Sequence, residues 1–333
     1  MRTTIAANAL CTLEEASATI ASGAVVVVAG DESLLSRLPR GNWIGGTIPY
    51  FMAPTGGTQT TDRVFVTELP LEPRLFESRM YSADELPAIV PDAPAHGFSL
   101  IIIPSESPAH VEYAEHAPDY PGLFLEPIVG WIAGVALEDV GRVVPRVFDG
   151  RSGQSSIEKA VVLRGELPPH KAARIGIINL FRGGGGDAIT FERTGFTASD
   201  CVVNCQGRNF ARYLGEIGAD TRLPLVADYH GAQINTSILS ADPASGVVTF
   251  FAPVFTGIEY RLAGPIGDYA ASFAAAVERA GVDAVFACNC ILNYRYGALE
   301  GKTTGHVIGP ITFGEVAYQL VNQTLVYLSI VDA

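Results

Sequence analysis

The chain has 333 residues, of which 48% are hydrophobic and 17% are charged, and its formal net charge at pH 7 is −13. This composition is typical of a compact folded protein, and the length is sufficient for two domains with their own cores. The negative charge argues against partners such as nucleic acid or an anionic membrane surface, because both would repel the chain.

The N-terminal stretch has no long apolar core and meets acidic residues early, so we expect no secretory signal. No apolar run reaches the roughly 20 residues that a bilayer-spanning helix needs. We therefore expect a cytoplasmic protein, whose five cysteines are reduced thiols.

The first predicted elements are a helix and three strands. Thr12 and Glu15 match a capping box and Gly23 ends the run, which predicts a helix over residues 12–23. Apolar, β-branched runs predict strands over residues 24–31, 42–51 and 63–69.

The middle of the chain is less regular. Five prolines break residues 70–94, a run of isoleucines predicts a strand over 99–103, and a short helix is expected over 107–116. Glycine and serine accumulate over 148–156, where we place the crossing into a second lobe. Further strands are expected over residues 159–163, 174–181, 188–192, 246–251 and 257–262, with a helix over 209–217.

The C-terminal elements repeat the N-terminal order. A helix is expected over residues 268–281, followed by strands over 284–290, 307–315 and 324–330. This internal similarity predicts an α/β fold of two related lobes, residues 1–150 and 151–333, built on mixed β-sheets flanked by helices.

Polar residues crowd the ends of these C-terminal strands, where α/β proteins tend to place binding sites. Cys288, Arg295, Glu315 and Asn322 are the candidates for ligand binding. Arg295 and Glu315 could hold the carboxylate and the ammonium group of an amino-acid-like ligand, or they could pair with each other as a structural bridge.

Asp228 and His230 form an Asp-x-His pair at the end of a predicted strand. Such a pair could ligate a divalent metal or orient an imidazole for acid-base catalysis, and otherwise His230 is a hydrogen-bonded loop histidine.

Two further patterns have simpler interpretations. Cys201, Cys205, Cys288 and Cys290 could together hold zinc, but their spacing differs from the usual C-x2-C, so we favour small buried side chains. The glycine run over residues 183–186 lacks the Gly-Lys-Ser/Thr ending of a phosphate loop, so we expect a mobile hairpin turn.

Two segments resemble FIST domains. Gly314-Glu315-Val316 followed by Asn322-Gln323-Thr324 is similar to the C-terminal pattern of that family, and Ile44-Gly45-Gly46-Thr47 resembles its glycine-rich N-terminal signature. Tyr50 and Phe51 stand where the family more usually has Gly-Glu. The resemblance implies a sensory module that binds a small ligand, with Gly45, Gly46 and Thr47 added to the ligand-binding residues. Some relatives in that family bind haem.

We therefore expect a cytoplasmic sensory protein that binds a small molecule and has no effector module of its own, so that its signal passes to a separate protein. One alternative is an enzyme that acts on a small substrate through Asp228 and His230, with or without a divalent metal. A further alternative is a haem-binding sensor, with an axial ligand among His96, His110, His116, His170, His230 and His306.

Overall fold

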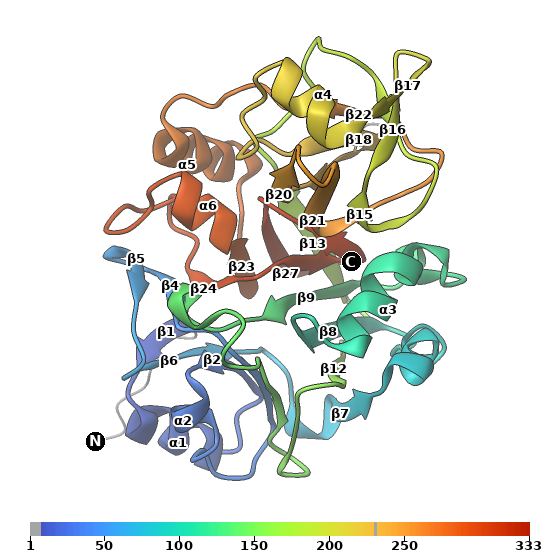
Figure 1. The fold of residues 1–333 in the computed structure, drawn as a ribbon. Coiled ribbons are helices and arrows are strands. Elements are labelled where there is room, and N and C mark those ends of the chain that lie inside the picture. The colour runs from blue at the N-terminus through green and yellow to red at the C-terminus, as the bar shows by residue number, and fades with distance from the viewer. Residues whose placement is uncertain (1–7, 230–231) are drawn as a thin grey trace.

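The computed structural model describes residues 8–229 and 232–333. Over these residues the protein has a mixed α/β fold with several mixed sheets flanked by helices, as the sequence predicts. The two-lobe arrangement is not confirmed, because strand pairing divides the described chain into three units of the same topology. In Figure 1 unit 1 is blue, unit 2 is cyan to green, and the orange and red part of unit 3 lies above them.

Unit 1 starts with the predicted helix, in which Thr12 and Glu15 form the expected capping box. Its elements are β1 (Asn8–Cys11), α1 (Leu13–Ala21), β2 (Val26–Gly30), α2 (Glu32–Leu35), β3 (Trp43–Thr47), β4 (Tyr50–Ala53), β5 (Gly56–Gln59) and β6 (Val64–Glu68).

Unit 2 uses short 3-10 helices where unit 1 has an α-helix. Its elements are η1 (Pro73–Leu75), β7 (Phe76–Tyr81), η2 (Ala83–Ile89), β8 (Gly97–Pro104), α3 (Pro108–His116), η3 (Ala117–Asp119), η4 (Leu123–Leu125), β9 (Ile128–Ala133), η5 (Leu137–Asp139), β10 (Val147–Asp149), β11 (Gln154–Ser156) and β12 (Ala160–Glu166).

Unit 3 repeats the pattern, with an insertion after its first strand. Its own elements are β13 (Lys171–Ile178), α5 (Tyr269–Ala280), β23 (Phe286–Cys290), α6 (Ile291–Tyr296), β24 (Gly309–Thr312), β25 (Glu315–Ala317), β26 (Gln319–Val321) and β27 (Leu325–Asp332).

The insertion spans residues 179–268 and forms the upper lobe in Figure 1. Its elements are β14 (Ile189–Thr190), β15 (Gly195–Ala198), β16 (Asp200–Val203), β17 (Gln206–Asn209), α4 (Phe210–Glu216), β18 (Leu225–Tyr229), β19 (Ala232–Thr236), β20 (Ile238–Asp242), β21 (Val247–Val254) and β22 (Tyr260–Leu262). They pair into sheets of their own, in the orders β17-β16-β14-β22-β18-β19 and β15-β21-β20, so the insertion adds a separate layer to unit 3.

The strand pairing of the three units is the same. In unit 1, β2 runs parallel to β3 and antiparallel to β6, and β6 also pairs with the edge strand β1. Unit 2 repeats this with β8 between β9 and β12, and with β7 at the edge. Unit 3 repeats it with β23 between β24 and β27, and with β13 at the edge. The predicted similarity between the two ends of the chain is thus a repeat in topology, and the sequence pattern missed its middle copy.

Each unit lends a hairpin to a neighbouring sheet, which locks the units together. The hairpin β10–β11 of unit 2 adds to β3 of unit 1, β25–β26 of unit 3 adds to β9 of unit 2, and β4–β5 of unit 1 adds to β24 of unit 3. Each unit thus gives a hairpin to one neighbour and receives a hairpin from the other, so that the three units form a closed cycle. The predicted lobe boundary at residue 150 lies within the hairpin β10–β11, whose two strands pair with each other.

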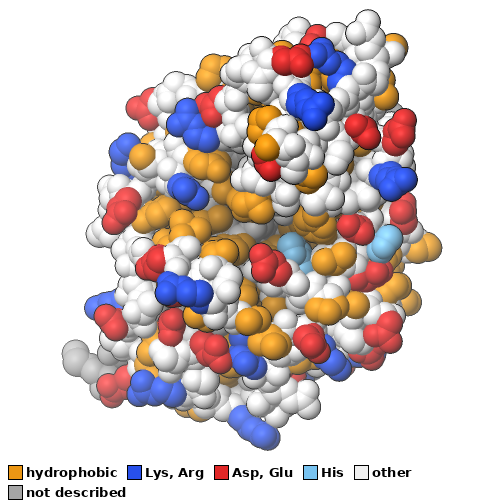
Figure 2. Space-filling view, in the orientation of Figure 1, with side chains coloured by type: hydrophobic (Ala, Val, Ile, Leu, Met, Phe, Trp, Pro, Cys, Tyr) orange, Lys and Arg blue, Asp and Glu red, His pale blue; other side chains and the backbone are white. Residues whose placement is uncertain are grey.

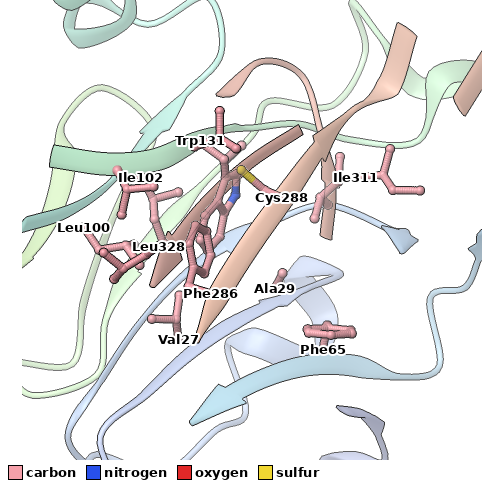
Figure 3. Packing of buried hydrophobic residues seen from close by; sticks show 14 of the residues in the cluster. Val27, Ala29, Phe65, Leu100, Ile102, Trp131, Phe286, Cys288, Ile311 and Leu328 are labelled. Atoms are coloured by element: carbon pink, nitrogen blue, oxygen red, sulfur yellow. The ribbon is translucent and has the colours of Figure 1, made fainter. Parts of the chain in front are cut away.

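The core lies where the central strands of the three units, β2, β8 and β23, meet. Val27 of β2, Leu100 of β8 and Phe286 of β23 take equivalent positions and belong to one buried cluster, which Figure 3 shows from close by. The next inward positions are Ala29, Ile102 and Cys288. Burial of apolar surface from every unit in one cluster makes the units cooperative parts of one fold.

The surface carries both signs of charge. Figure 2 shows acidic and basic side chains scattered over this face, and hydrophobic side chains gathered in a hollow across the middle, below the insertion. In the part of the chain that the structure describes, no helix is long and apolar enough to cross a membrane.

Candidate functional site

Gly45, Gly46 and Thr47 lie in β3, where their role is structural. A Cβ at Gly45 would lie 2.6 Å from the Val28 carbonyl oxygen of the neighbouring strand, so no other residue fits there. Gly130 and Gly309 take the same position in units 2 and 3, and a Cβ there would meet the neighbouring carbonyl at 1.8 and 2.1 Å. These glycines allow the parallel strands of each unit to approach closely.

Thr47 is also buried, and its hydroxyl oxygen accepts a 3.0 Å hydrogen bond from the Arg146 amide of unit 2. It therefore helps to hold the hairpin β10–β11 on the sheet of unit 1. The structure gives these three residues packing roles and does not place them around a cavity with the other candidates.

Cys288 occupies a core position equivalent to Ala29 and Ile102, and its side chain is buried. Its thiol donates a 3.3 Å hydrogen bond to the Gly130 carbonyl oxygen of unit 2. Burial raises the pKa of the thiol well above its usual value, with a smaller contribution from nearby Glu315. A buried, protonated thiol is a packing group and not a nucleophile.

Glu315 is the most unusual buried group in the described part of the chain. In the pairing of β25 with β9, Glu315 lies opposite Trp131, the residue after Gly130. The residues at the equivalent position of the other two hairpins are Val147 and Phe51, and both are fully buried. Unit 3 thus places a carboxyl group where units 1 and 2 supply apolar side chains.

One oxygen of this carboxyl group is well bound. Oε2 of Glu315 accepts hydrogen bonds from the hydroxyl and the amide of Thr324, at 2.8 and 3.3 Å, whereas Oε1 has no hydrogen-bond partner among the described residues. Burial raises the pKa of Glu315 to about 8, although Thr324, Cys290 and Thr312 offset part of that effect. At neutral pH the group is therefore mainly protonated.

A network of buried amides surrounds this position. Asn293 donates to Asn289 Oδ1 at 2.8 Å and to the Thr324 carbonyl oxygen at 3.1 Å, and the Tyr269 hydroxyl donates to Asn293 Oδ1. These bonds satisfy buried polar atoms at the end of β23 and fix the start of α6 against β27.

The same network extends into the insertion. Asn235 donates a 3.0 Å hydrogen bond to the Asn322 carbonyl oxygen, and Ser237 donates one of 2.7 Å to Gln323 Oε1. Asn322 is fully buried, and its Oδ1 has no partner within the described ranges. The Asn-Gln-Thr segment that resembles the FIST pattern thus joins unit 3 to its insertion.

Arg295 does not share a site with Glu315. Its side chain lies on α6 and is exposed, with its guanidinium 6.0 Å from the centroid of the Tyr296 ring, whereas Glu315 is 0% exposed. Arg295 and Glu315 therefore form neither a shared ligand site nor a structural bridge. The ends of the strands, where that site was expected, are filled by buried side chains. The pairing of β25 with β9, far away in sequence, draws Glu315 into the core.

Asp228 lies on β18 and is exposed, at the edge of a groove described below, whereas His230 lies outside the described residues. Of the four candidate zinc ligands, Cys288 and Cys290 lie in the core of unit 3 and Cys201 is buried in the insertion, as expected, whereas Cys205 is exposed, so the prediction of a buried side chain is wrong there. All four are free thiols. Among residues 8–229 and 232–333 no group of three or more His, Cys, Asp or Glu could hold a metal ion.

The described histidines lie apart from one another. His110 is buried at the start of α3, its Nδ1 accepts a 3.2 Å hydrogen bond from the Glu106 amide, and burial lowers its pKa to about 4. His96 and His306 contact backbone carbonyl oxygens, and His116 lies 3.9 Å from Glu112. No described histidine lines the large groove.

This groove, here called the insertion groove, has a volume of about 1190 Å3. It is lined by β13, by β18, β19 and β22 of the insertion, and by the last turn of α5. Ile175, Ile177, Val226 and Ile234 form its apolar part, and Ala276 and Ala280 of α5 complete the wall. Its volume lies slightly above the range of about 300 to 1,000 Å3 that is usual for small-molecule sites.

The rim of the insertion groove is charged. Arg182, Arg261 and Arg279 lie there with Asp228 and Glu259. Arg261 pairs with Glu259 at 2.8 Å, whereas neither Arg182 nor Arg279 forms an ion pair with a described residue. Sequence reasoning missed these arginines because they are far apart in the chain and the groove arises from tertiary packing.

The glycine run over residues 183–186 borders this groove. It connects β13 to β14, which belong to different sheets, so it is not a hairpin turn. Gly183 bridges to Ala263, and Arg261 donates to the Gly186 carbonyl oxygen, which ties the run to β22.

The fold and this groove define an α/β protein of three cyclically linked units with a ligand-sized groove beside its insertion. The chain belongs to a family of unknown function, DUF6976, whose model matches residues 11–331. No curated protein and no solved structure matches the chain. The resemblance to FIST domains therefore stays a prediction.

Proposed function

We propose that this protein is a sensory protein that binds a small molecule in the insertion groove. The main support for the proposal is the insertion in unit 3, which interrupts the topology that the three units share. Within the described residues the units share one pattern, and the insertion in unit 3 creates a groove of about 1190 Å3 against the edge strand β13.

The groove has the chemistry of a binding site. Apolar and charged side chains line it together, so it could accept a ligand that has both an apolar part and a charged group. The buried candidates in the core of unit 3 have no such access, because Cys288, Glu315 and Asn322 are all 1% exposed or less.

Sensing also requires that occupancy change the protein. A ligand in the groove would contact both the insertion and unit 3, which are otherwise joined through hydrogen bonds such as Asn235 Nδ2 to the Asn322 carbonyl oxygen at 3.0 Å. Binding would then favour one relative position of the two parts, and a separate protein could recognise that position. The similarity of the Asn322-Gln323-Thr324 segment to FIST domains is a further argument for sensing.

The test is equilibrium dialysis of the protein against a metabolite extract, followed by mass spectrometry of the compounds that it enriches. Ala280 lines the groove and is exposed, so Ala280→Trp narrows the groove without disturbing the core. Ala271, on an exposed part of the same helix outside the groove, gives the matched control Ala271→Trp.

We expect at least one compound to be enriched by the wild type and by Ala271→Trp but not by Ala280→Trp. The proposal fails when no compound is enriched, or when both variants enrich the same compounds equally.

A further inference from the structure

The apolar part of the insertion groove is elongated along a strand. Ile175 and Ile177 alternate along β13, and Ile234 of β19 faces the same space. Alternate residues of a strand point to one side, so these side chains form a continuous apolar strip. Such a strip suits an extended hydrocarbon chain better than a compact polar molecule.

Cationic groups line the same groove. Arg182 donates hydrogen bonds to the carbonyl oxygens of Asn179 and Phe181, at 2.9 and 2.8 Å, so its position is fixed while its charge is not neutralised by a described carboxylate. Arg279, near the end of α5, is exposed and likewise forms no ion pair with the described residues.

A guanidinium group binds carboxylates and phosphates through paired hydrogen bonds. The lining of the groove carries three arginines and two carboxylates, so its formal charges leave one positive charge in excess, which matches a ligand with one negative charge better than one with two. A singly charged carboxylate is therefore favoured over a phosphate monoester.

We infer that the ligand of the insertion groove is an amphiphilic carboxylate, with its apolar chain along Ile175, Ile177 and Ile234 and its head group beside Arg182 and Arg279. This inference rests on the proposed function and specifies its ligand class.

Isothermal titration calorimetry with decanoate, below its micelle concentration, tests the inference on the full chain. Decyl phosphate, decyltrimethylammonium and acetate serve as comparison ligands with a changed head or no chain. The variant Arg182→Gln/Arg279→Gln removes both guanidinium groups, and Arg174→Gln/Arg193→Gln makes the same charge change at exposed positions outside the groove.

We expect decanoate to bind to the wild type and the control with equal affinity, and at least tenfold more weakly to Arg182→Gln/Arg279→Gln. Octanoate should bind roughly tenfold more weakly than decanoate, because two buried methylene groups are lost. Equal binding by both double variants, or tighter binding of decyl phosphate or decyltrimethylammonium, overturns the inference.

The dialysis experiment separates this inference from the proposed function. A compound that is enriched by the wild type and lost in Ala280→Trp, together with no binding of decanoate, leaves the groove as the site and rejects the ligand class. Absence of both results rejects both proposals.

Discussion

The hydroxyl of Thr324 donates a 2.8 Å hydrogen bond to Oε2 of Glu315, and this pair lies fully inside the protein. Glu315 belongs to a hairpin that completes the sheet of unit 2, and Thr324 precedes the last strand of unit 3. The bond thus fixes the path of the chain between two sheets, at a position where units 1 and 2 carry apolar residues.

The stability of the protein should fall as pH rises toward 8. The folded-state pKa of Glu315 is about 8, above its ordinary value of 4.5, so the folded state holds an extra proton between these values. The contribution is fully present below the ordinary value and is lost as pH rises through the folded value, by up to about 1.4 kcal/mol per pH unit. Urea unfolding between pH 6.5 and 8.5 measures this slope.

His110 acts in the opposite direction at lower pH. Its folded-state pKa of about 4 lies below the ordinary 6.5, so its contribution rises with pH between these values and is complete above them. Above pH 6.5 the effect of Glu315 should therefore be visible by itself. Glu315→Gln should flatten the slope, and Glu300→Gln, at an exposed position, should leave it unchanged. An unaltered slope in Glu315→Gln would refute the assignment.

Removal of the Thr324 hydroxyl should destabilise the protein. Thr324→Val keeps the shape of the side chain but leaves the buried carboxyl group with one hydrogen bond fewer, at a cost of about 2 kcal/mol. Thr304 is an equally buried threonine whose hydroxyl has no partner in the described part of the chain, so Thr304→Val is the matched control. Urea unfolding should show little or no loss for that control, and equal losses would argue against a role for the Glu315 bond.

The equivalent glycines should not tolerate alanine. A Cβ at Gly130 would lie 1.8 Å from the Ile101 carbonyl oxygen, so Gly130→Ala must separate β8 from β9 and should cost about 3 kcal/mol or more. At Gly207, on β17, a Cβ would have no other atom within 4 Å, and Gly207→Ala should be tolerated. Thermal unfolding compares the two, and similar melting temperatures would contradict the close-approach argument.

Arg295 should be dispensable for ligand binding. It is exposed on α6 and lies outside the insertion groove, so Arg295→Ala should change neither the compounds enriched in dialysis nor the unfolding free energy by more than about 0.5 kcal/mol. If Arg295→Ala lost the enrichment but kept its stability, the ligand would bind at the end of β23 and at α6, and not in the insertion groove.

The sequence indicates the strands of units 1 and 3 because runs such as Val26–Gly30 and Leu325–Asp332 are dense in β-branched residues. It does not indicate unit 2 as a repeat, because 3-10 helix η2, with Pro87 inside it, replaces the helix that made the other copies similar. The local elements could therefore be predicted from the sequence, whereas the exchange of hairpins between the units could not.

The candidate site was harder to predict for a similar reason. Glu315 was expected at the mouth of the strands, but pairing of β25 with β9 buries it, and that partner lies far away in sequence. Arg182 and Arg279 line the same groove only because the insertion packs beside β13 and α5. Long-range packing, which leaves no short motif, decides both outcomes.

Hydrogen–deuterium exchange of the chain, with and without the metabolite fraction that dialysis enriches, tests the binding site most directly. We predict slower exchange in β13 and in the last turn of α5, which line the groove, and the same protection in the Ala271→Trp control as in the wild type. Slower exchange confined to residues 288–324, or the same protection in Ala280→Trp, would contradict the account.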